Sequence, residues 1–300
     1  MASKLYIGNG TATPSIVVEK PTPMPCTIQK KINNSGILVG GDTIIDLNGA
    51  TSVGTCALYG AYYGNTSITG AVDMSSLREI SSNNACTSMF QDCTGITSVD
   101  LGSLQHITHN QACSSMFRNC TNLIMVNLHS LMDVSQESFN AAFQGCTKLT
   151  TVDLSSFKSI NGCACQRLFS GCTSLVSIDL HSLTTIPASY SCTNMFNGCT
   201  SLTIIDLSSL NKITGGSALA NAFQGCTSLK TLSFPSLDSS SFGSYKDQFN
   251  NMLKGVTGCT LHFPSNLDPE SGSTVISSLT SYPNFGGTST ILSFDLPATE

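Results

Sequence analysis

Residues 142–160 read AFQGCTKLTTVDLSSFKSI and carry two hydrophobic periods side by side. Val152 and Leu154 alternate with polar neighbours, which is typical of a short strand with one buried side. In the equivalent segment of an earlier copy, apolar residues stand at i, i+3, i+4 and i+7, the stripe of a short helix: Cys86, Met89, Phe90 and Cys93. The segment therefore predicts one short helix or turn and one short strand.

The motif Phe-x-x-Cys-Thr recurs through the chain at a nearly constant spacing. Its cysteines are separated by 27, 26, 26, 27 and 27 residues: Cys93, Cys120, Cys146, Cys172, Cys199 and Cys226. One unit of this length cannot bury its own apolar side, so the units must stack and pair their strands in parallel. The period and pattern predict an α/β leucine-rich-repeat solenoid of about eight coils, with parallel strands on one face and short helices or turns on the other.

Less regular copies flank the clean ones and set the predicted domain limits. Asn65 stands where an upstream copy should carry cysteine, and the last copy ends near Pro264. We expect an N-terminal attachment or cap segment at 1–42, the repeat array at 43–264 and a C-terminal cap at 265–300. Three prolines, Pro21, Pro23 and Pro25, predict an extended connection in the first segment.

The composition excludes several classes of protein. Charged residues make up 10% of the chain, against roughly 25% in an average globular protein, while 40% hydrophobic residues are enough for a core. The net charge is −5 without a Lys/Arg run, which argues against a nucleic-acid partner. No apolar run reaches the roughly 18 residues needed to insert in a membrane, and residues 1–10 lack the apolar core of a secretory signal.

The cysteines follow the repeat, which predicts packing and not cross-linking. A second row lies seven residues before the first: Cys86, Cys113, Cys165 and Cys192. Phe139 and Leu219 replace cysteine in the remaining copies, so the position accepts a hydrophobic residue, as free cysteine is. The ladder Cys93, Cys120, Cys146, Cys172, Cys199 and Cys226 is therefore predicted to be structural core. Bridges between adjacent coils stay open, and paired zinc-ligand spacing is absent.

A row of acidic residues is the candidate binding site. It occupies the position between the two apolar strand residues: Asp73, Asp100, Asn127, Asp153, Asp179 and Asp206. Alternation puts this row on the exposed side of the sheet, with neighbours about 5 Å apart, where like charges repel. Either nearby Ser and Thr hydroxyls and water disperse the charge, or the row recruits a cation such as Ca²⁺ or a basic partner. His129 and His181 share one phase but lie two repeats apart, too far to hold one metal ion jointly.

No catalytic residues and no resident metal or cofactor are predicted. Every candidate Asp or Ser is duplicated in neighbouring repeats, whereas an active site is a single shaped place. Phosphate-binding glycine motifs are absent from the sequence as well. An enzyme is therefore the least favoured class.

The Met/Ala-Phe-x-x-Cys-Thr units resemble the BspA-type leucine-rich repeats and related surface-protein repeats of bacterial adhesins, over about residues 60–264. The N-terminal segment with Lys4-Leu5-Tyr6-Ile7-Gly8 resembles the N-termini of phage tail-associated proteins from viruses of gut bacteria. The tail from His262 to Glu300 resembles the C-termini of repeat proteins from the same setting. These resemblances imply adhesion to a host-surface glycan or protein through the exposed strands, on a phage tail, with residues 1–42 contacting other virion proteins. A homo-oligomer is implied too, although no coiled-coil heptad is present. The alternatives are a bacterial cell-surface adhesin and a structural spacer or assembly protein of a virion.

Overall fold

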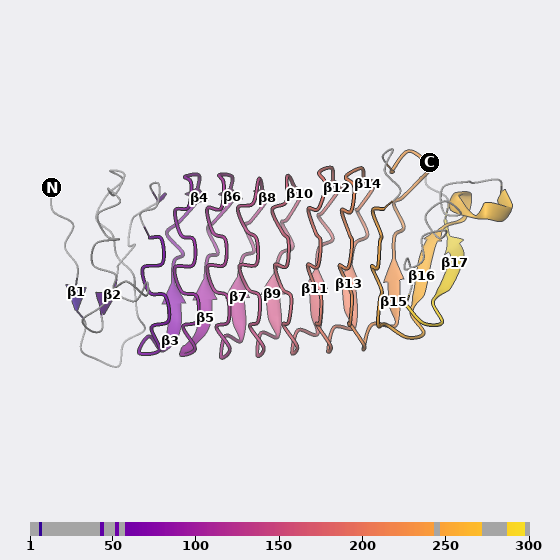
Figure 1. The fold of residues 1–300 in the computed structure, drawn as a ribbon. Coiled ribbons are helices and arrows are strands. Elements are labelled where there is room, and N and C mark those ends of the chain that lie inside the picture. The colour runs from indigo at the N-terminus through magenta and orange to yellow at the C-terminus, as the bar shows by residue number, and fades with distance from the viewer. Residues whose placement is uncertain are drawn as a thin grey trace.

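The computed structural model describes residues 6–7, 43–44, 52–53, 58–242, 247–271 and 287–297. From residue 58 onward the described chain winds into coils that stand side by side along one axis (Figure 1). Six successive coils each contribute one strand to a long parallel sheet and a shorter strand to a second sheet. The predicted parallel-strand solenoid is confirmed.

The first sheet contains the strands that the Val-Asp-Leu pattern predicts. Its order is β13-β11-β9-β7-β5-β3, with strands Gly70–Asp73 (β3), Ile96–Asp100 (β5), Met125–Asn127 (β7), Thr151–Asp153 (β9), Ser177–Asp179 (β11) and Ile204–Asp206 (β13). Val126 pairs with Val99 on one side and with Val152 on the other. Because all three are buried, their neighbours in each strand must face outward.

A second parallel sheet closes each coil after a tight turn. Its strands have two residues each, in the order β14-β12-β10-β8-β6-β4: Glu79–Ile80 (β4), His106–Ile107 (β6), Asp133–Val134 (β8), Ser159–Ile160 (β10), Thr185–Ile186 (β12) and Lys212–Ile213 (β14). The second residue of every strand is a buried Ile or Val. This is the position that ends the repeat motif, and it is isoleucine in every one of these strands except β8, which has Val134.

Of the short helix or turn expected in each repeat, the structure shows the turn, and the helix is wrong. Residues 83–92 are turns, and the described residues contain no helix beyond two short 3-10 turns near the C-terminus. Alternate N–H groups bond within the coil, as from Met89 to the Cys86 carbonyl at 3.1 Å. The intervening ones bond to the next coil, as from Phe90 to the Met116 carbonyl at 2.8 Å. The backbone is thus satisfied across coils, as in a sheet.

Left-handed residues explain why no helix forms. Ser88 has φ 52° and Asp92 has φ 62°, four residues apart, and a residue in this conformation cannot continue a right-handed helix. At the position just before the ladder cysteine, later coils have Asn119, Gly145 and Gly171, with φ between 58° and 77°. Asp, Asn and Gly tolerate this conformation best, so their recurrence was the sequence signal for a turn.

An aromatic column runs through the core along the solenoid axis. The seven rings stack with successive centroids 5.1–5.7 Å apart: Tyr62, Phe90, Phe117, Phe143, Phe169, Phe196 and Phe223. All are buried. Each inner ring stacks on its equivalents in the coils before and after it, so the column joins the seven coils that carry these rings.

The C-terminal end extends the array with a third sheet. Its order is β15-β16-β17, formed by Thr231–Ser233 (β15), Thr260–Pro264 (β16) and Ile291–Leu296 (β17), with 3-10 turns at Ser265–Leu267 and Pro269–Ser271. Parallel pairing thus continues into the region predicted as a cap.

At the N-terminal end, Tyr6–Ile7 (β1) pairs antiparallel with Thr43–Ile44 (β2). The three prolines lie outside the described residues, so the limits at 42 and 264 stay predictions. Within the described parts of the chain, no helix has the length and apolar character to cross a membrane.

A buried glutamine supplies a stability prediction. Gln248 is fully buried, and neither polar atom of its amide has a hydrogen-bond partner among the described residues. An unsatisfied buried polar group costs about 1–3 kcal/mol, and methionine has a similar length without that penalty. Gln248→Met is therefore expected to raise the free energy of unfolding by about 1–3 kcal/mol in urea denaturation. Gln248→Glu, the matched control, should lower it, and unchanged stability in the Met variant would contradict the burial.

Candidate functional site

The acidic row forms one straight line across the first sheet. The strand register pairs Asp73 with Asp100, and Asp153 with Asp179, which in turn pairs with Asp206. Asn127 fills the gap between Asp100 and Asp153. The members are exposed or half-buried. The structure thus places all six predicted residues in a single row, one in each coil.

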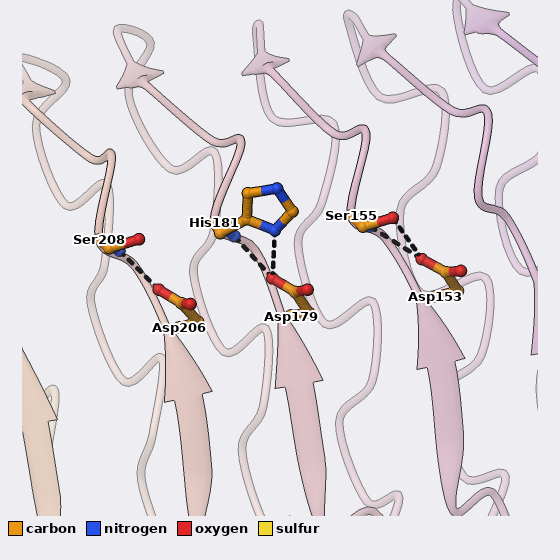
Figure 2. Close-up of polar contacts among 6 residues, drawn as sticks. All are labelled: Asp153, Ser155, Asp179, His181, Asp206 and Ser208. Carbon is orange, nitrogen blue, oxygen red and sulfur yellow. Dashed lines mark hydrogen bonds and ion pairs between the residues drawn. The ribbon is translucent and has the colours of Figure 1, made fainter.

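Each member of the row ends its strand by the same turn. The side-chain Oδ1 accepts the backbone N–H of the residue two positions later, at 2.9–3.3 Å, as expected for an Asx turn: Ser75 on Asp73, Gly102 on Asp100, His129 on Asn127, Ser155 on Asp153, His181 on Asp179 and Ser208 on Asp206. Figure 2 shows these contacts for Asp153, Asp179 and Asp206. One side-chain oxygen of every member of the row therefore accepts a hydrogen bond that stabilises the turn.

Further polar contacts reduce the repulsion within the row. The Asn127 amide donates to Asp100 Oδ1 at 2.9 Å, and the His181 ring lies 2.7 Å from Asp179 Oδ1. Burial raises the pKa of the Asp179 carboxyl, but hydrogen bonds from the His181 backbone and ring, with the ring's charge, outweigh burial and hold that pKa below its ordinary value. His129 bonds Asn127 in the same way. Each histidine ring thus contacts the Asp or Asn side chain of the turn to which it belongs.

The described residues contain no group of three or more His, Cys, Asp or Glu side chains placed to hold a metal ion. The Ca²⁺ hypothesis for the acidic row stays a prediction. The melting temperature in Ca²⁺ and in chelator decides it, since an ion bound only to the folded chain raises that temperature.

The turn role of the row gives a prediction with a built-in control. Asp153 Oδ1 accepts both the N–H and the hydroxyl of Ser155, at 3.0 and 2.7 Å. Asp153→Ala removes this acceptor and should cost about 1 kcal/mol in urea unfolding, the usual net value of such a bond. Asp153→Asn keeps the acceptor, as Asn127 does naturally, and should cost much less. Equal losses in both variants would show that the charge, and not the turn, stabilises the strand end.

Exposed aliphatic residues, which the sequence interpretation missed, lie on this side of the first sheet and of β17. The large aliphatic side chains that are exposed within the described residues lie in two adjacent rows: Ile124 (47% exposed), Met125 (52%), Val176 (47%), Ile204 (63%) and Ile291 (58%). Met125, Ile204 and Ile291 occupy the position just before the inward-facing strand residue, which is the buried Val126 in β7 and a half-buried residue in β13 and β17. Ile124 and Val176 precede that position. Tyr59 and Tyr190, the remaining large hydrophobics exposed in the described chain, lie in turns.

We term the exposed side of the first sheet, together with the same side of the adjoining strand β15, the strand face. It consists of three rows: the acidic row; the middle row Ala71, Ser98, Met125, Thr151, Ser177, Ile204 and Thr231; and the rim row Thr97, Ile124, Thr150, Val176, Thr203 and Lys230. Most other copies carry Thr or Ser at the aliphatic positions, and the exceptions are Ala71 and Lys230. The signal was therefore a departure from the consensus, not a recurring residue.

The cysteine ladder lies inside the coils, on the opposite side of the strands. All six members are buried, and the twelve cysteines in the described residues are free of disulfides. Each ladder thiol donates to a backbone carbonyl of the preceding coil, as Cys146 does to Phe117 and Cys172 to Phe143, at 3.1 and 3.2 Å. The same Phe117 carbonyl accepts the Cys120 N–H within its own coil. The ladder thus joins adjacent coils through weak S–H···O bonds.

Burial keeps these thiols protonated. Loss of hydration raises the pKa of Cys93, Cys192 and Cys226 to about 12. The same cause raises the pKa of Cys120, Cys146 and Cys172 well above the ordinary value, with a smaller contribution from neighbouring thiols. A protonated, inaccessible thiol is a poor nucleophile and a poor metal ligand. The ladder therefore has a packing role in the described structure.

The match to a family model agrees with this architecture. The family model described as "BspA type Leucine rich repeat region (6 copies)" matches residues 60–164 and 140–246. A leucine rich repeat protein of T. pallidum is 25% identical, with a TM-score of 0.39 over 60% of this chain and 71% of that one. A leucine-rich repeat protein from Bacteroides ovatus ATCC 8483 is 18% identical, with a TM-score of 0.39 over 97% and 75%. No curated protein matches the chain.

Proposed function

Because the chain belongs to the BspA-type leucine-rich repeat family, we propose that it is a non-enzymatic recognition protein whose strand face binds a partner on a host-cell surface. Solenoids commonly present extended binding surfaces of this kind. The family indicates a binding role in general, and the strand face is where this chain offers a surface to bind with.

One observation carries the proposal. Four of the five large aliphatic side chains that are exposed within the described residues lie on the strand face, and the fifth, Ile291, lies in β17. The aliphatic side chains that point into the coils are buried or partly buried. Clustered apolar surface on a soluble protein marks interaction sites. The small polar residues between them, such as Thr151 and Ser177, can supply hydrogen bonds at low entropic cost.

Binding of the purified full chain to host cells tests the proposal. Ile204→Thr and Met125→Thr should each weaken binding without loss of stability, because threonine already occupies the same row at Thr151 and Thr231. Tyr190→Asn is the matched control, since it removes an exposed hydrophobic residue from a turn at φ 60°, which asparagine tolerates. Unchanged binding in both strand-face variants would instead favour a structural spacer.

We also propose display on a phage tail, with residues 1–42 as the attachment to other virion proteins and a glycan or protein as the host ligand. Support comes from the resemblance of the chain ends alone, because most of residues 1–42 lie outside the described structure. Mass spectrometry of purified virions should detect the protein. Its presence instead on the bacterial envelope, in cells free of phage, would favour a cell-surface adhesin.

A further inference from the structure

We propose that the partner of the strand face is an extended protein segment that carries two aliphatic side chains flanking a basic one. This inference rests on the proposed recognition function and names the chemistry of the ligand. Its basis is the order of side chains along the middle row, together with the charge of the acidic row beside it.

The middle row is apolar at two points and polar between them. Its consecutive members are Met125, Thr151, Ser177 and Ile204, in four adjacent strands. Met125 and Ile204 are 52% and 63% exposed. Removing such side chains from water is favourable only against apolar surface. A protein segment with aliphatic side chains offers that surface, whereas a hydroxyl-covered sugar offers little.

The acidic row gives the polar centre a negative charge. Asp153 and Asp179 belong to the same strands as Thr151 and Ser177 and are both exposed. Each turn bond uses Oδ1, which leaves Oδ2 for a partner. The three rows of the strand face, as far as the structure describes them, contain five carboxylates and one lysine, Lys230. Charge complementarity therefore calls for a basic group in the centre of the ligand.

The distance between Met125 and Ile204 fits a ligand segment in the extended conformation. Met125 and Ile204 are separated by three strand spacings of about 4.8 Å, or about 14 Å in all. Four residues of extended chain at about 3.4 Å each cover the same distance. Aliphatic residues at i and i+4 of such a segment would contact Met125 and Ile204. The residue at i+2 faces the same side and would lie near Asp153 and Asp179.

Three labelled peptides test the inference by fluorescence anisotropy with the full chain: Thr-Val-Thr-Lys-Thr-Val-Thr, the same peptide with glutamate for lysine, and the same with threonine for both valines. At low ionic strength the lysine peptide is expected to bind about tenfold more tightly than either control, the effect of about 1.4 kcal/mol. The double variant Asp153→Asn, Asp179→Asn keeps both turns and should remove the preference for lysine over glutamate. Ile204→Thr should remove the preference for valine over threonine.

Several results would overturn the inference. The inference is wrong if the lysine peptide shows no saturable binding, or if the lysine and glutamate peptides bind equally well. It is also wrong if the variants keep the peptide preferences of the unmodified chain, or if a host glycan binds independently of Ile204. If the peptides fail while cell binding still depends on Ile204 and Met125, this inference falls and the proposed recognition function stands. If cell binding is unaffected by both variants as well, the proposed function falls with it.

Discussion

Raising the pH from 8 to 10 is expected to unfold the repeat array. Burial raises the pKa of nine thiols in the core: Cys93, Cys113, Cys120, Cys146, Cys165, Cys172, Cys192, Cys199 and Cys226. The unfolded chain releases these protons above about pH 8.5, while the folded chain keeps them. A raised folded-state pKa gives stability that is complete below the unfolded pKa and is lost as the pH rises toward the folded one.

The expected loss is large because the thiols act together. One pH unit above its unfolded pKa, each buried thiol costs about 1.4 kcal/mol. Nine of them cost on the order of 10 kcal/mol, comparable with the 5–15 kcal/mol that holds an ordinary domain together. Circular dichroism between pH 7 and 11 should therefore record a steep, cooperative transition that reverses on return to neutral pH under reducing conditions.

A single substitution separates the thiols from other groups that titrate at high pH. Cys192→Ala removes one fully buried thiol and should reduce the slope of unfolding free energy against pH by about 1.4 kcal/mol per unit above the unfolded pKa. Lysines and tyrosines are the same in both proteins, and the slope does not depend on any stability lost at neutral pH. An identical slope in both proteins would mean that Cys192 ionises as readily when folded as when unfolded.

Phe143→Ala is expected to lower the free energy of unfolding by about 3–5 kcal/mol, the usual cost of emptying a buried phenylalanine site. Phe143 stacks on Phe117 and Phe169, each with centroids 5.6 Å away, and meets the edge of Phe139 at 5.5 Å. The substitution therefore removes one member of the column and three aromatic contacts.

The location of the damage should follow from the one-dimensional architecture. Each coil contacts only its neighbours, so a weak interface lets the array open there. Hydrogen exchange in the Phe143→Ala variant should accelerate most in the coils around residues 117–169. Ile204→Ala is the control, because Ile204 is mostly exposed and its loss should leave stability nearly unchanged. Uniform acceleration along the whole chain would contradict a column of separable interfaces.

The sequence predicted the strands and the core because both recur in every copy. Val152 and Leu154 alternate with polar residues, and the replacement of cysteine by Phe139 and Leu219 indicated a hydrophobic position. The helix prediction failed because consecutive turns can give buried residues the spacing of a helical stripe. Residues in the left-handed conformation, such as Ser88 and Asp92, exclude a helix and allow consecutive turns. A serine in the sequence does not indicate that conformation.

The site was predicted less well than the fold, for a related reason. The acidic row was found because it repeats, but its turn bonds depend on backbone geometry that no spacing reveals. Ile204 and Met125 were missed because they differ from their counterparts in other copies. Residues that bind a particular partner need not obey the repeat, whereas residues that stack coils must.

Site-resolved alkylation at pH 8 tests the stacked architecture most directly, with mass spectrometry to assign each cysteine. The account predicts that Cys120, Cys146, Cys172 and the other ladder thiols react only after unfolding, since they are buried and bonded to the preceding coil. The half-buried Cys163 should react in the folded protein. Ladder thiols that react as fast as Cys163, or that are found in disulfides, would contradict it.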